Sequence, residues 1–556
     1  MKNVLTIVIL VLVMGCTKKI EKIPQESKIE TPFVWEGANL YFLLTDRFNN
    51  GDPTNDVNFD RTKETGKLRG FEGGDIKGIT QKIQDGYFTD LGINAIWMTP
   101  IVEQIHGGTD EGTGTTYGYH GYWAKDWTAL DPNFGTKDDL KELVEIAHKK
   151  GIRIVLDAVI NHTGPVTEKD PAWPEDWVRV NPKCKYTNYE NTITCTLVDN
   201  LPDVKTENNK AVKLPPQLIE KWKAEGRYEQ EIMELDAFFE RTGYPRAPRF
   251  YIIKWLTDYI AEFGIDGYRA DTVKHTEEYV WQEFKTECDY AFAQWKENNP
   301  DKVLDNNAFY LVGEVYNYVI STGQLFDFGD KKVNYFDNSF HSLINFEFKT
   351  DALKDFETIF SKYSKILQTK MKDFGTLNYL TSHDDGKPFD AKREKAIKSA
   401  TALLLSPGTS QTYYGDESAR PLIIEDTEGD ATLRSFMNWD DIEKNIDTKK
   451  VLSHWQKLGQ FRAKHPAVGA GIHQMISQTP YLFYRSFSKG NYKDEVVIGL
   501  DLNKGEKQLD VSKIFKDGDV LFDAYSNQSI EVKNGIIVID STYDIVLLEK
   551  NIKIRI

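Results

Sequence analysis

Carboxyl and imidazole side chains gather in four short motifs along the 556-residue sequence. Each motif directly follows an apolar run that is typical of a buried strand. Carboxyl and imidazole groups can exchange protons, and a carboxylate can also act as a nucleophile. Four such motifs at strand ends indicate an enzyme site built from distant parts of the chain. The motifs are Asp157–His162, Gly267–His275, Gly313–Tyr316 and Thr381–Asp385.

The apolar runs alternate with amphipathic helix patterns such as Lys137–Lys150 and Phe250–Phe263. Eight strand candidates with helices between them predict an α/β fold, a closed (β/α)8 TIM barrel. In that fold the residues that follow the strands converge on one mouth of the barrel. The candidates are Leu40–Thr45, Ala95–Thr99, Ile152–Val159, Gly267–Asp271, Tyr310–Val315, Tyr335–Phe340, Leu377–Thr381 and Gln411–Tyr414.

Two regions depart from this alternation. Residues 163–245 hold Pro, Asn, Trp and two cysteines where one short connection would be enough, which predicts an inserted subdomain after the third strand. Residues 469–556 carry only strand patterns, which predicts a C-terminal antiparallel β-sandwich. The barrel would then comprise residues 37–162 and 246–468. The C-terminal strand candidates are Leu482–Phe487, Glu495–Leu500, Val520–Asp523 and Gly535–Leu548.

The first residues resemble an export signal. An apolar run, Val4–Met14, ends on Gly15 and Cys16, and it is too short to span a bilayer. Val13–Cys16 resembles a bacterial lipoprotein cleavage site, in which Cys16 becomes the lipidated first residue; a plain signal peptide is the alternative. We expect a signal at 1–16 and a tether at 17–36. The mature protein would be attached to a bacterial membrane, the outer membrane, through a lipid anchor alone; secretion is the alternative.

Export also bears on the cysteines and on the partners. Cys184 and Cys195 lie close together in a loop-like region and could form a disulfide outside the cytoplasm. Cys288 falls in a helical pattern, Glu278–Asn298, and we expect a buried, inert thiol there. The net charge of −16 argues against nucleic acid, because phosphate binding needs a basic face. A neutral ligand fits better, and we expect a monomer.

In order and spacing the four motifs resemble the signature regions of the α-amylase family of glycoside hydrolases. The resemblance extends from about Asn39 to Asp440 and includes Tyr119–Trp123, Leu201–Asp203 and Tyr413–Glu417. It implies an enzyme that cleaves internal α-1,4-glucosidic bonds of starch, glycogen and maltooligosaccharides with retention of anomeric configuration. The expected partner is therefore an α-glucan.

The resemblance assigns three catalytic acids: Asp271 as nucleophile, Glu314 as general acid/base and Asp384 as the acid that favours the strained transition state. Retention requires two carboxyl groups about 5–5.5 Å apart, one attacking the anomeric carbon and one protonating the leaving oxygen. Arg269 lies two residues before Asp271, so on a strand both project the same way. A guanidinium there favours the charged carboxylate that a nucleophile requires.

Sugar binding is assigned by the same resemblance. His162 and His383 would hydrogen-bond the sugar being cleaved, and Tyr122 would stack on it. Asp157 would orient Arg269 without touching substrate, and Ser382 stands where the family usually has Asn. The full set is Arg269, His120, Tyr122, His162, His383, Lys274 and His275, the last two contacting sugars on the leaving side.

The resemblance also implies one or two calcium ions, which prefer six to eight oxygen ligands. The first site would use Asn161, Asp203 and the backbone carbonyl of His275, with ordinary loop polarity as the alternative. The second would lie near the start of the chain, with a solvated Asx turn as the alternative. Its ligands would be Asn50, Asp52, Asn55, Asp56, Gly73 and Asp75.

Two other functions stay open. A glucan transglycosylase, like the cyclodextrin glycosyltransferases, shares the Lys274–His275 pair. Hydrolysis is favoured, because Thr276–Glu278 follow where those transferases carry an aromatic residue and because only one β-domain remains. A surface protein that merely binds glucan is also compatible with the fold, but the three intact acids argue against it.

Overall fold

The computed structural model describes residues 31–110 and 112–550. The predicted signal, with Cys16, and most of the predicted tether lie outside the described residues, so those predictions stay untested. Within the described ranges, no helix has both the length and the apolar character needed to cross a membrane.

Eight parallel strands close into a barrel in the order β1-β16-β15-β14-β11-β10-β7-β2. Every residue of these strands is buried, as expected where helices cover the outside of a parallel sheet and side chains fill the inside. The predicted barrel is thus confirmed. The strands are β1 (Asn39–Leu43), β2 (Ala95–Met98), β7 (Arg153–Ala158), β10 (Gly267–Ala270), β11 (Tyr310–Gly313), β14 (Ser342–Asn345), β15 (Gly375–Tyr379) and β16 (Thr409–Tyr413).

The sixth predicted strand, Tyr335–Phe340, is wrong. The strand is β14, two residues further on, and the predicted segment forms turns whose aromatic rings are buried. The side chain of Asn334 accepts a hydrogen bond from the backbone of Phe336 at 3.0 Å, and Asn338 has a left-handed φ of 55°. A buried apolar run does not by itself distinguish a strand from a packed turn.

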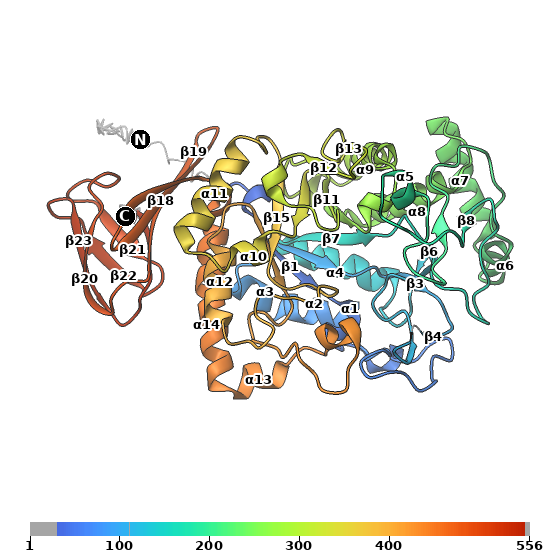
Figure 1. Cartoon of the computed structure of the whole chain (residues 1–556), viewed down its shortest axis with the longest axis horizontal. Helices are drawn as coiled ribbons and strands as arrows, with labels where there is room; N and C mark the ends of the chain where they lie inside the picture. The colour runs from blue at the N-terminus through green and yellow to red at the C-terminus, as the bar shows by residue number, and fades with distance from the viewer. Residues whose placement is uncertain (1–30, 111, 551–556) are drawn as a thin grey trace, which may run out of the picture.

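Helices surround the barrel (Figure 1). A capping box between Thr136 and Asp139 starts α4, and α8 is capped at its C-terminal end by Gly264, whose φ is 72°. A Cβ on Gly264 would lie 2.0 Å from the Trp295 ring, so both the backbone and the packing require glycine there. The helices are α1 (Thr45–Phe48), α2 (Ile76–Gln84), α3 (Tyr87–Asp90), α4 (Lys137–Lys149), α8 (Pro248–Phe263), α9 (Glu278–Asn298), α10 (Phe348–Asp351), α11 (Phe356–Gln368), α12 (Ala396–Leu404), α13 (Trp439–Lys444), α14 (Ile446–Lys464) and α15 (Pro466–Ala470).

Residues 163–245 project from the barrel on the side opposite the C-terminal strands (Figure 1). Cys184 and Cys195 form a disulfide there, as predicted, and Cys288 in α9 is a free, buried thiol. The segment contains β8 (Val178–Arg179), α5 (Glu190–Ile193), β9 (Asp203–Val204), α6 (Pro216–Ala224) and α7 (Tyr228–Thr242). Two-stranded antiparallel sheets elsewhere on the barrel pair β3 (Val102–Gln104) with β6 (Ala124–Leu130), β4 (Thr109–Asp110) with β5 (Thr115–Thr116), and β12 (Leu325–Asp327) with β13 (Lys332–Asn334).

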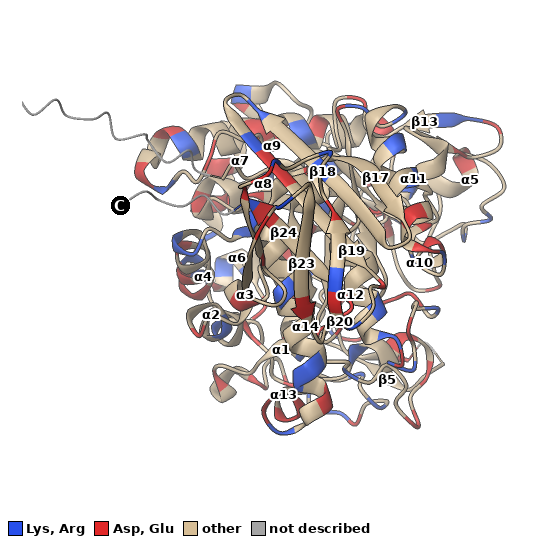
Figure 2. Cartoon of the chain, turned by 90° about the vertical axis from the view of Figure 1, so that its left-hand side faces the viewer, with Lys and Arg blue, Asp and Glu red and all other residues tan. Residues whose placement is uncertain are grey.

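The C-terminal strands form a six-stranded antiparallel sheet, β17-β18-β19-β24-β21-β22, and a two-stranded sheet, β20-β23. Apolar side chains from both sheets share one core, which confirms the sandwich. The predicted strand Gly535–Leu548 is two strands in different sheets. Figure 2 shows basic and acidic residues interspersed on this side. The strands are β17 (Ile472–Gln478), β18 (Tyr481–Lys489), β19 (Tyr492–Leu500), β20 (Gly505–Asp510), β21 (Val520–Asp523), β22 (Gln528–Glu531), β23 (Ile536–Ser541) and β24 (Val546–Lys550).

Candidate active site

Three acids follow barrel strands at the same mouth. Asp271 follows β10, Glu314 follows the neighbouring β11, and Asp384 lies in the loop after β15. The backbone N–H of Glu314 donates to the carbonyl of Ala270 at 3.0 Å, and the N–H of Thr272 donates to the Glu314 carboxylate at 3.1 Å. Asp271 and Glu314 therefore lie side by side.

One buried guanidinium connects Asp271, Glu314 and Asp157. Nη1 of Arg269 lies 2.6 Å from a carboxylate oxygen of Asp271 and 3.0 Å from one of Asp157, and its Nη2 lies 2.8 Å from Glu314. The Trp97 indole donates to Asp157 at 3.1 Å. The predicted contact of Arg269 with Asp271 is present, whereas its contact with Glu314 and the part played by Trp97 were missed.

The charge states of two of the acids are shifted in opposite directions. Burial raises the pKa of Glu314, and the charges of Asp271 and Asp384 raise it further; the lowering effect of Arg269 does not cancel this. Burial also raises the pKa of Asp384, but His383, Arg269 and Arg434 outweigh it, so the net shift is downward. Glu314 can thus keep a proton at a pH where Asp384 is charged, as acid and stabiliser roles require.

Beside this network lies a set of three histidines and one tyrosine. The Tyr122 hydroxyl donates to Asp157 at 2.8 Å, and its ring stacks on His383 with centroids 5.1 Å apart. Nε2 of His162 lies 3.1 Å from the Tyr122 carbonyl, and the Tyr122 N–H donates to Nδ1 of His120 at 3.1 Å. Four of the seven predicted sugar-binding residues are therefore contiguous.

Burial keeps these imidazoles neutral. It lowers the pKa of His383 to about 4, and it lowers the pKa of His120 and His162 in the same direction. A neutral imidazole has one donor and one acceptor, which suits sugar hydroxyls. Nδ1 of His162 is buried without a hydrogen-bond partner among the described residues, as few buried polar atoms are.

The loop after β15 is held by side chains outside the predicted set. The Ser382 hydroxyl donates to Asp384 at 3.1 Å, and Nε of Arg434 donates to the carbonyl of His383 at 2.9 Å. The Asp384 side chain is 38% exposed. Arg434 lies in η6 (Gly429–Arg434), far along the sequence from every motif, so no local signal could have indicated it.

On the other side of the acids, η3 (Val273–His275) places Lys274 and His275. Lys274 Nζ lies 5.7 Å from the centre of the Tyr186 ring and 5.2 Å from that of Tyr316, and it donates to the Tyr316 carbonyl at 3.2 Å. Tyr186 and Tyr316 are 54% and 49% exposed, and neither was predicted as a site residue. Tyr316 belongs to the third motif and could have been found; Tyr186 stands in a loop without a motif.

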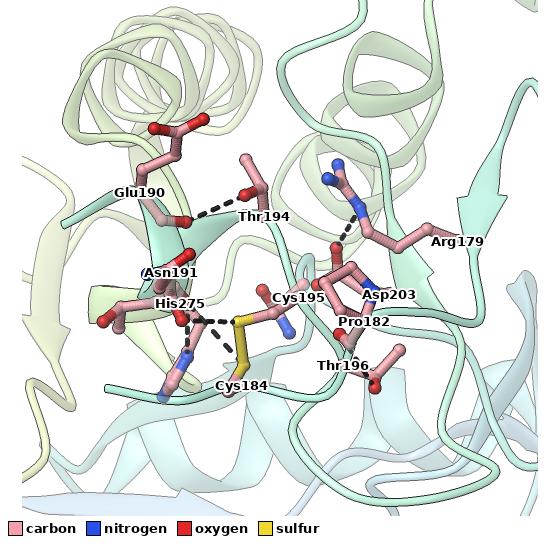
Figure 3. Close-up of a disulfide and its surroundings, with 12 residues drawn as sticks. Arg179, Pro182, Cys184, Glu190, Asn191, Thr194, Cys195, Thr196, Asp203 and His275 are labelled. Carbon is pink, nitrogen blue, oxygen red and sulfur yellow. Dashed lines mark hydrogen bonds and ion pairs between the residues drawn. A yellow bond between two sulfur atoms is a disulfide. The ribbon is translucent and has the colours of Figure 1, made fainter. Parts of the chain in front are cut away.

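Three oxygen atoms converge at the first predicted calcium site. The side-chain oxygen of Asn161 faces the carbonyl of His275 and a carboxylate oxygen of Asp203, so acceptors oppose acceptors. With the Asn161 amide reversed, its nitrogen would donate to them at 2.8 and 3.3 Å. Burial raises the pKa of Asp203, which Arg179 only partly offsets, and Figure 3 shows the ion pair of these two residues. Asn161, Asp203 and the His275 carbonyl thus offer amide, carboxylate and backbone oxygens of the kind that calcium prefers, although Arg179 already pairs with Asp203.

The second predicted site fits in part. Side-chain oxygens of Asn50 and Asn55 are buried without hydrogen-bond partners in the described chain, and Gly73 and Asp56 lie beside Asn50. Asp75, however, caps α2 and accepts backbone N–H groups with both oxygens, and Asp52 pairs with Lys77 at 2.6 Å. Across the described residues, no group of three or more His, Cys, Asp and Glu side chains is placed to hold a metal. Any ion would therefore need amide and backbone oxygens in addition to carboxylates.

Comparison with known proteins gives one family. A family model described as "Alpha amylase, catalytic domain" matches residues 42–460. The periplasmic alpha-amylase of Escherichia coli (strain K12) is 35% identical over 507 residues, covering 80% of this chain and 70% of that protein. A cyclomaltodextrin glucanotransferase of Thermoanaerobacterium thermosulfurigenes is 26% identical over 527 residues, and the match covers 89% of this chain but only 64% of the transferase.

Among solved structures, an Anoxybacillus alpha-amylase is similar over 94% of this chain and 99% of its own, with a TM-score of 0.64 and 25% identity. The family model spans most of the sequence and includes the strands that place Asp271, Glu314 and Asp384. This protein belongs to the α-amylase family of glycoside hydrolases.

Proposed function

We propose that the protein is an endo-acting, retaining α-amylase that hydrolyses internal α-1,4-glucosidic bonds of starch, glycogen and maltooligosaccharides. The observation that carries this proposal is the Arg269 guanidinium, which holds Asp271 and Glu314 next to each other. Two adjacent carboxyl groups, one to attack the anomeric carbon and one to protonate the leaving oxygen, are what a double displacement requires.

In the first step a carboxylate oxygen of Asp271 attacks the anomeric carbon, and the bond from that carbon to the leaving oxygen breaks. Glu314 gives its proton to that oxygen, which leaves as a hydroxyl on the remaining glucan. In the second step Glu314, now a carboxylate, takes a proton from water, and the water oxygen attacks the same carbon. The bond to Asp271 breaks, and both acids regain their starting states.

The neighbouring residues would bind the sugar being cleaved. His162 and His383 are neutral and can exchange hydrogen bonds with its hydroxyls, and Tyr122 offers a ring next to them. Asp384 is charged and partly exposed, so it can bind hydroxyls and favour positive charge developing at the anomeric carbon. His120 supports the backbone of Tyr122.

Calcium would have a structural role. Asn161, Asp203 and the His275 carbonyl would hold one ion and so join the inserted segment to two strand ends of the barrel, where the backbone of Val204 already donates to Asn161 at 2.7 Å. A second ion would take oxygens of Asn50 and Asn55, with Asp52, Asp56, Gly73 and Asp75 around them. Bound calcium would balance the negative charge of the buried carboxylate and coordinate the amide oxygens.

The test is incubation of the purified protein with amylose and maltoheptaose. Product size shows the position of attack, and proton NMR during the first minutes shows the anomer. We expect chain lengths to fall quickly and the new reducing ends to be α. New β ends would show inversion and would remove the assigned roles of Asp271 and Glu314.

Transglycosylation is the second candidate, favoured by the two exposed rings beside Lys274, which could hold an acceptor sugar in place of water. Incubation with maltotriose separates the two functions. A hydrolase gives glucose and maltose, whereas a transferase gives longer or cyclic glucans in the same assay.

We also propose that the chain is exported and carries a lipid on Cys16. The periplasmic relative and the Cys184–Cys195 disulfide support export. Labelling cells with a palmitate analogue should mark the wild type and not Cys16→Ser, which should leave the membrane fraction. An unlabelled, soluble wild-type protein would remove the lipid anchor and leave plain secretion.

A further inference from the structure

The loop closed by the Cys184–Cys195 disulfide lies directly against the residues on the leaving side of the acids. The carbonyl of Thr192 accepts a hydrogen bond from Nδ1 of His275 at 2.9 Å, and the Tyr186 ring meets the His275 ring edge-on at 5.7 Å (Figure 3 shows His275 beside the disulfide). We propose that this disulfide loop positions the leaving-side wall, defined as Tyr186, Lys274, His275 and Tyr316, and thereby sets affinity for the sugars beyond the bond that is cut. The inference rests on the proposed function.

The base of the loop is closed twice. Next to the disulfide, the N–H of Cys184 donates to the carbonyl of Thr196 at 2.9 Å, and Lys183 and Thr196 form an isolated bridge. Between these points the loop has only four residues of helix, α5, and Tyr186 has a left-handed φ of 54°. A left-handed backbone is uncommon for a residue other than glycine, and contacts in the folded protein offset its cost. The covalent closure is therefore well placed to hold Tyr186 and Thr192 toward His275.

The same loop also contacts the hairpin β12–β13. The N–H of Tyr189 donates to Asp330 at 2.9 Å, and the Tyr189 ring packs edge-on against Phe328 with centroids 5.1 Å apart. Nζ of Lys331 lies 3.7 Å from the centre of the Tyr189 ring. Phe326 of this hairpin lies 5.8 Å from Lys274 Nζ. The disulfide loop thus contacts both His275, the residue next to Lys274, and the hairpin that carries Phe326 beside Lys274.

The acids are held differently. Asp271 and Glu314 bind Arg269, which is itself held by Asp157, and all four residues lie in barrel strands or directly after them. Opening the disulfide loop should therefore weaken the binding of leaving-side sugars much more than it slows the cleavage step. A substrate whose leaving group is not a sugar would be insensitive to the change.

The experiment compares two substrates in saturating calcium. α-Maltosyl fluoride releases fluoride and needs no sugar on the leaving side, whereas maltohexaose does. For the double variant Cys184→Ser/Cys195→Ser we expect KM for maltohexaose to rise about tenfold, the loss of roughly one well-made contact, while kcat/KM for the fluoride changes less than about twofold. Cys288→Ala, which removes a buried thiol from α9, should match the wild type on both substrates.

Equal losses on both substrates, or no change on either in a folded double variant, would overturn the inference. A wild type that turns over neither substrate would instead contradict the proposed function. If the double variant does not fold, Tyr186→Ala with the disulfide intact gives the same test. It should raise KM for maltohexaose alone, and Tyr186→Phe, which keeps the ring, should restore it. An unchanged KM in Tyr186→Ala would also contradict the inference.

Discussion

The two sides of the acid pair are supported by different kinds of structure. On one side, Arg269, Asp157 and Trp97 belong to fully buried strands of the barrel. On the other side, Tyr186 and Thr192 stand on a disulfide loop, and His275 is held by that loop. Barrel strands position the reacting carboxyl groups, and loops position the residues that would bind the leaving-side sugars. Changes on the barrel side should therefore lower kcat, and changes on the loop side should mainly raise KM.

The largest effect is expected from Asp271→Asn. An amide cannot form the covalent intermediate, so kcat should fall by at least about 10³-fold, or about 4 kcal/mol of transition-state stabilisation. Binding of maltohexaose, measured by calorimetry, should stay close to that of the wild type because the shape of the side chain is kept. Near-normal turnover in a folded variant would mean that another residue is the nucleophile.

The pH dependence tests the barrel side without a mutation. Glu314 must carry a proton to act as the acid, so activity is present below its raised pKa and is lost as the pH rises through it. We expect the alkaline limb of kcat/KM to lie well above the ordinary glutamate pKa of about 4.3 and to fall about tenfold per pH unit. A limb near pH 4 to 5 would contradict the environment described for Glu314.

Calcium removal tests the link between the two sides. An ion bound only by the folded protein stabilises it by about 2.7 kcal/mol at a hundred times its Kd, so chelation should lower the melting temperature measured by calorimetry. Asp203→Ala should do the same with calcium present. Glu207→Ala is the matched control, because Glu207 also pairs with Arg179 at 2.5 Å but is not a proposed ligand. Unchanged melting after exhaustive chelation, with no calcium found by metal analysis, would remove both ions.

The smallest effect is expected from Trp97→Phe. The variant loses one hydrogen bond to Asp157, worth about 1 kcal/mol, so kcat should fall about fivefold with little change in KM. Trp255→Phe removes similar volume from a buried indole that has no hydrogen-bond partner among the described residues. It should lower stability but not kcat. A change confined to KM in Trp97→Phe would break the distinction between the two sides.

The sequence was sufficient to locate most of the barrel strands, in which every residue is buried. Strands such as β7 and β10 are buried throughout, so their apolar runs located them, and the barrel then implied that the residues after them meet. The segment Tyr335–Phe340 failed because its aromatic side chains are equally buried in turns. Local pattern records burial and does not record the path of the backbone.

The site was likewise predictable where it depends on strand positions, and not where it depends on side-chain directions or loop paths. Asp271 and Glu314 adjoin through their strands, which the order of motifs indicated. Three contacts depend on side-chain directions inside the folded barrel, which the order of motifs does not give. They are those of Arg269 with Glu314, of the Trp97 indole with Asp157, and of Arg434 with the His383 carbonyl. Tyr186 depends on how a loop without regular pattern folds back.

The most direct test of the central claim is to trap the intermediate on Asp271. In Glu314→Gln the fluoride of α-maltosyl fluoride leaves without an acid, but no base activates water for the second step. Mass spectrometry of a protease digest should therefore show one maltosyl group on the peptide that contains Asp271. Fluoride release without any adduct, or an adduct on another residue, would contradict the assignment of Asp271 and Glu314.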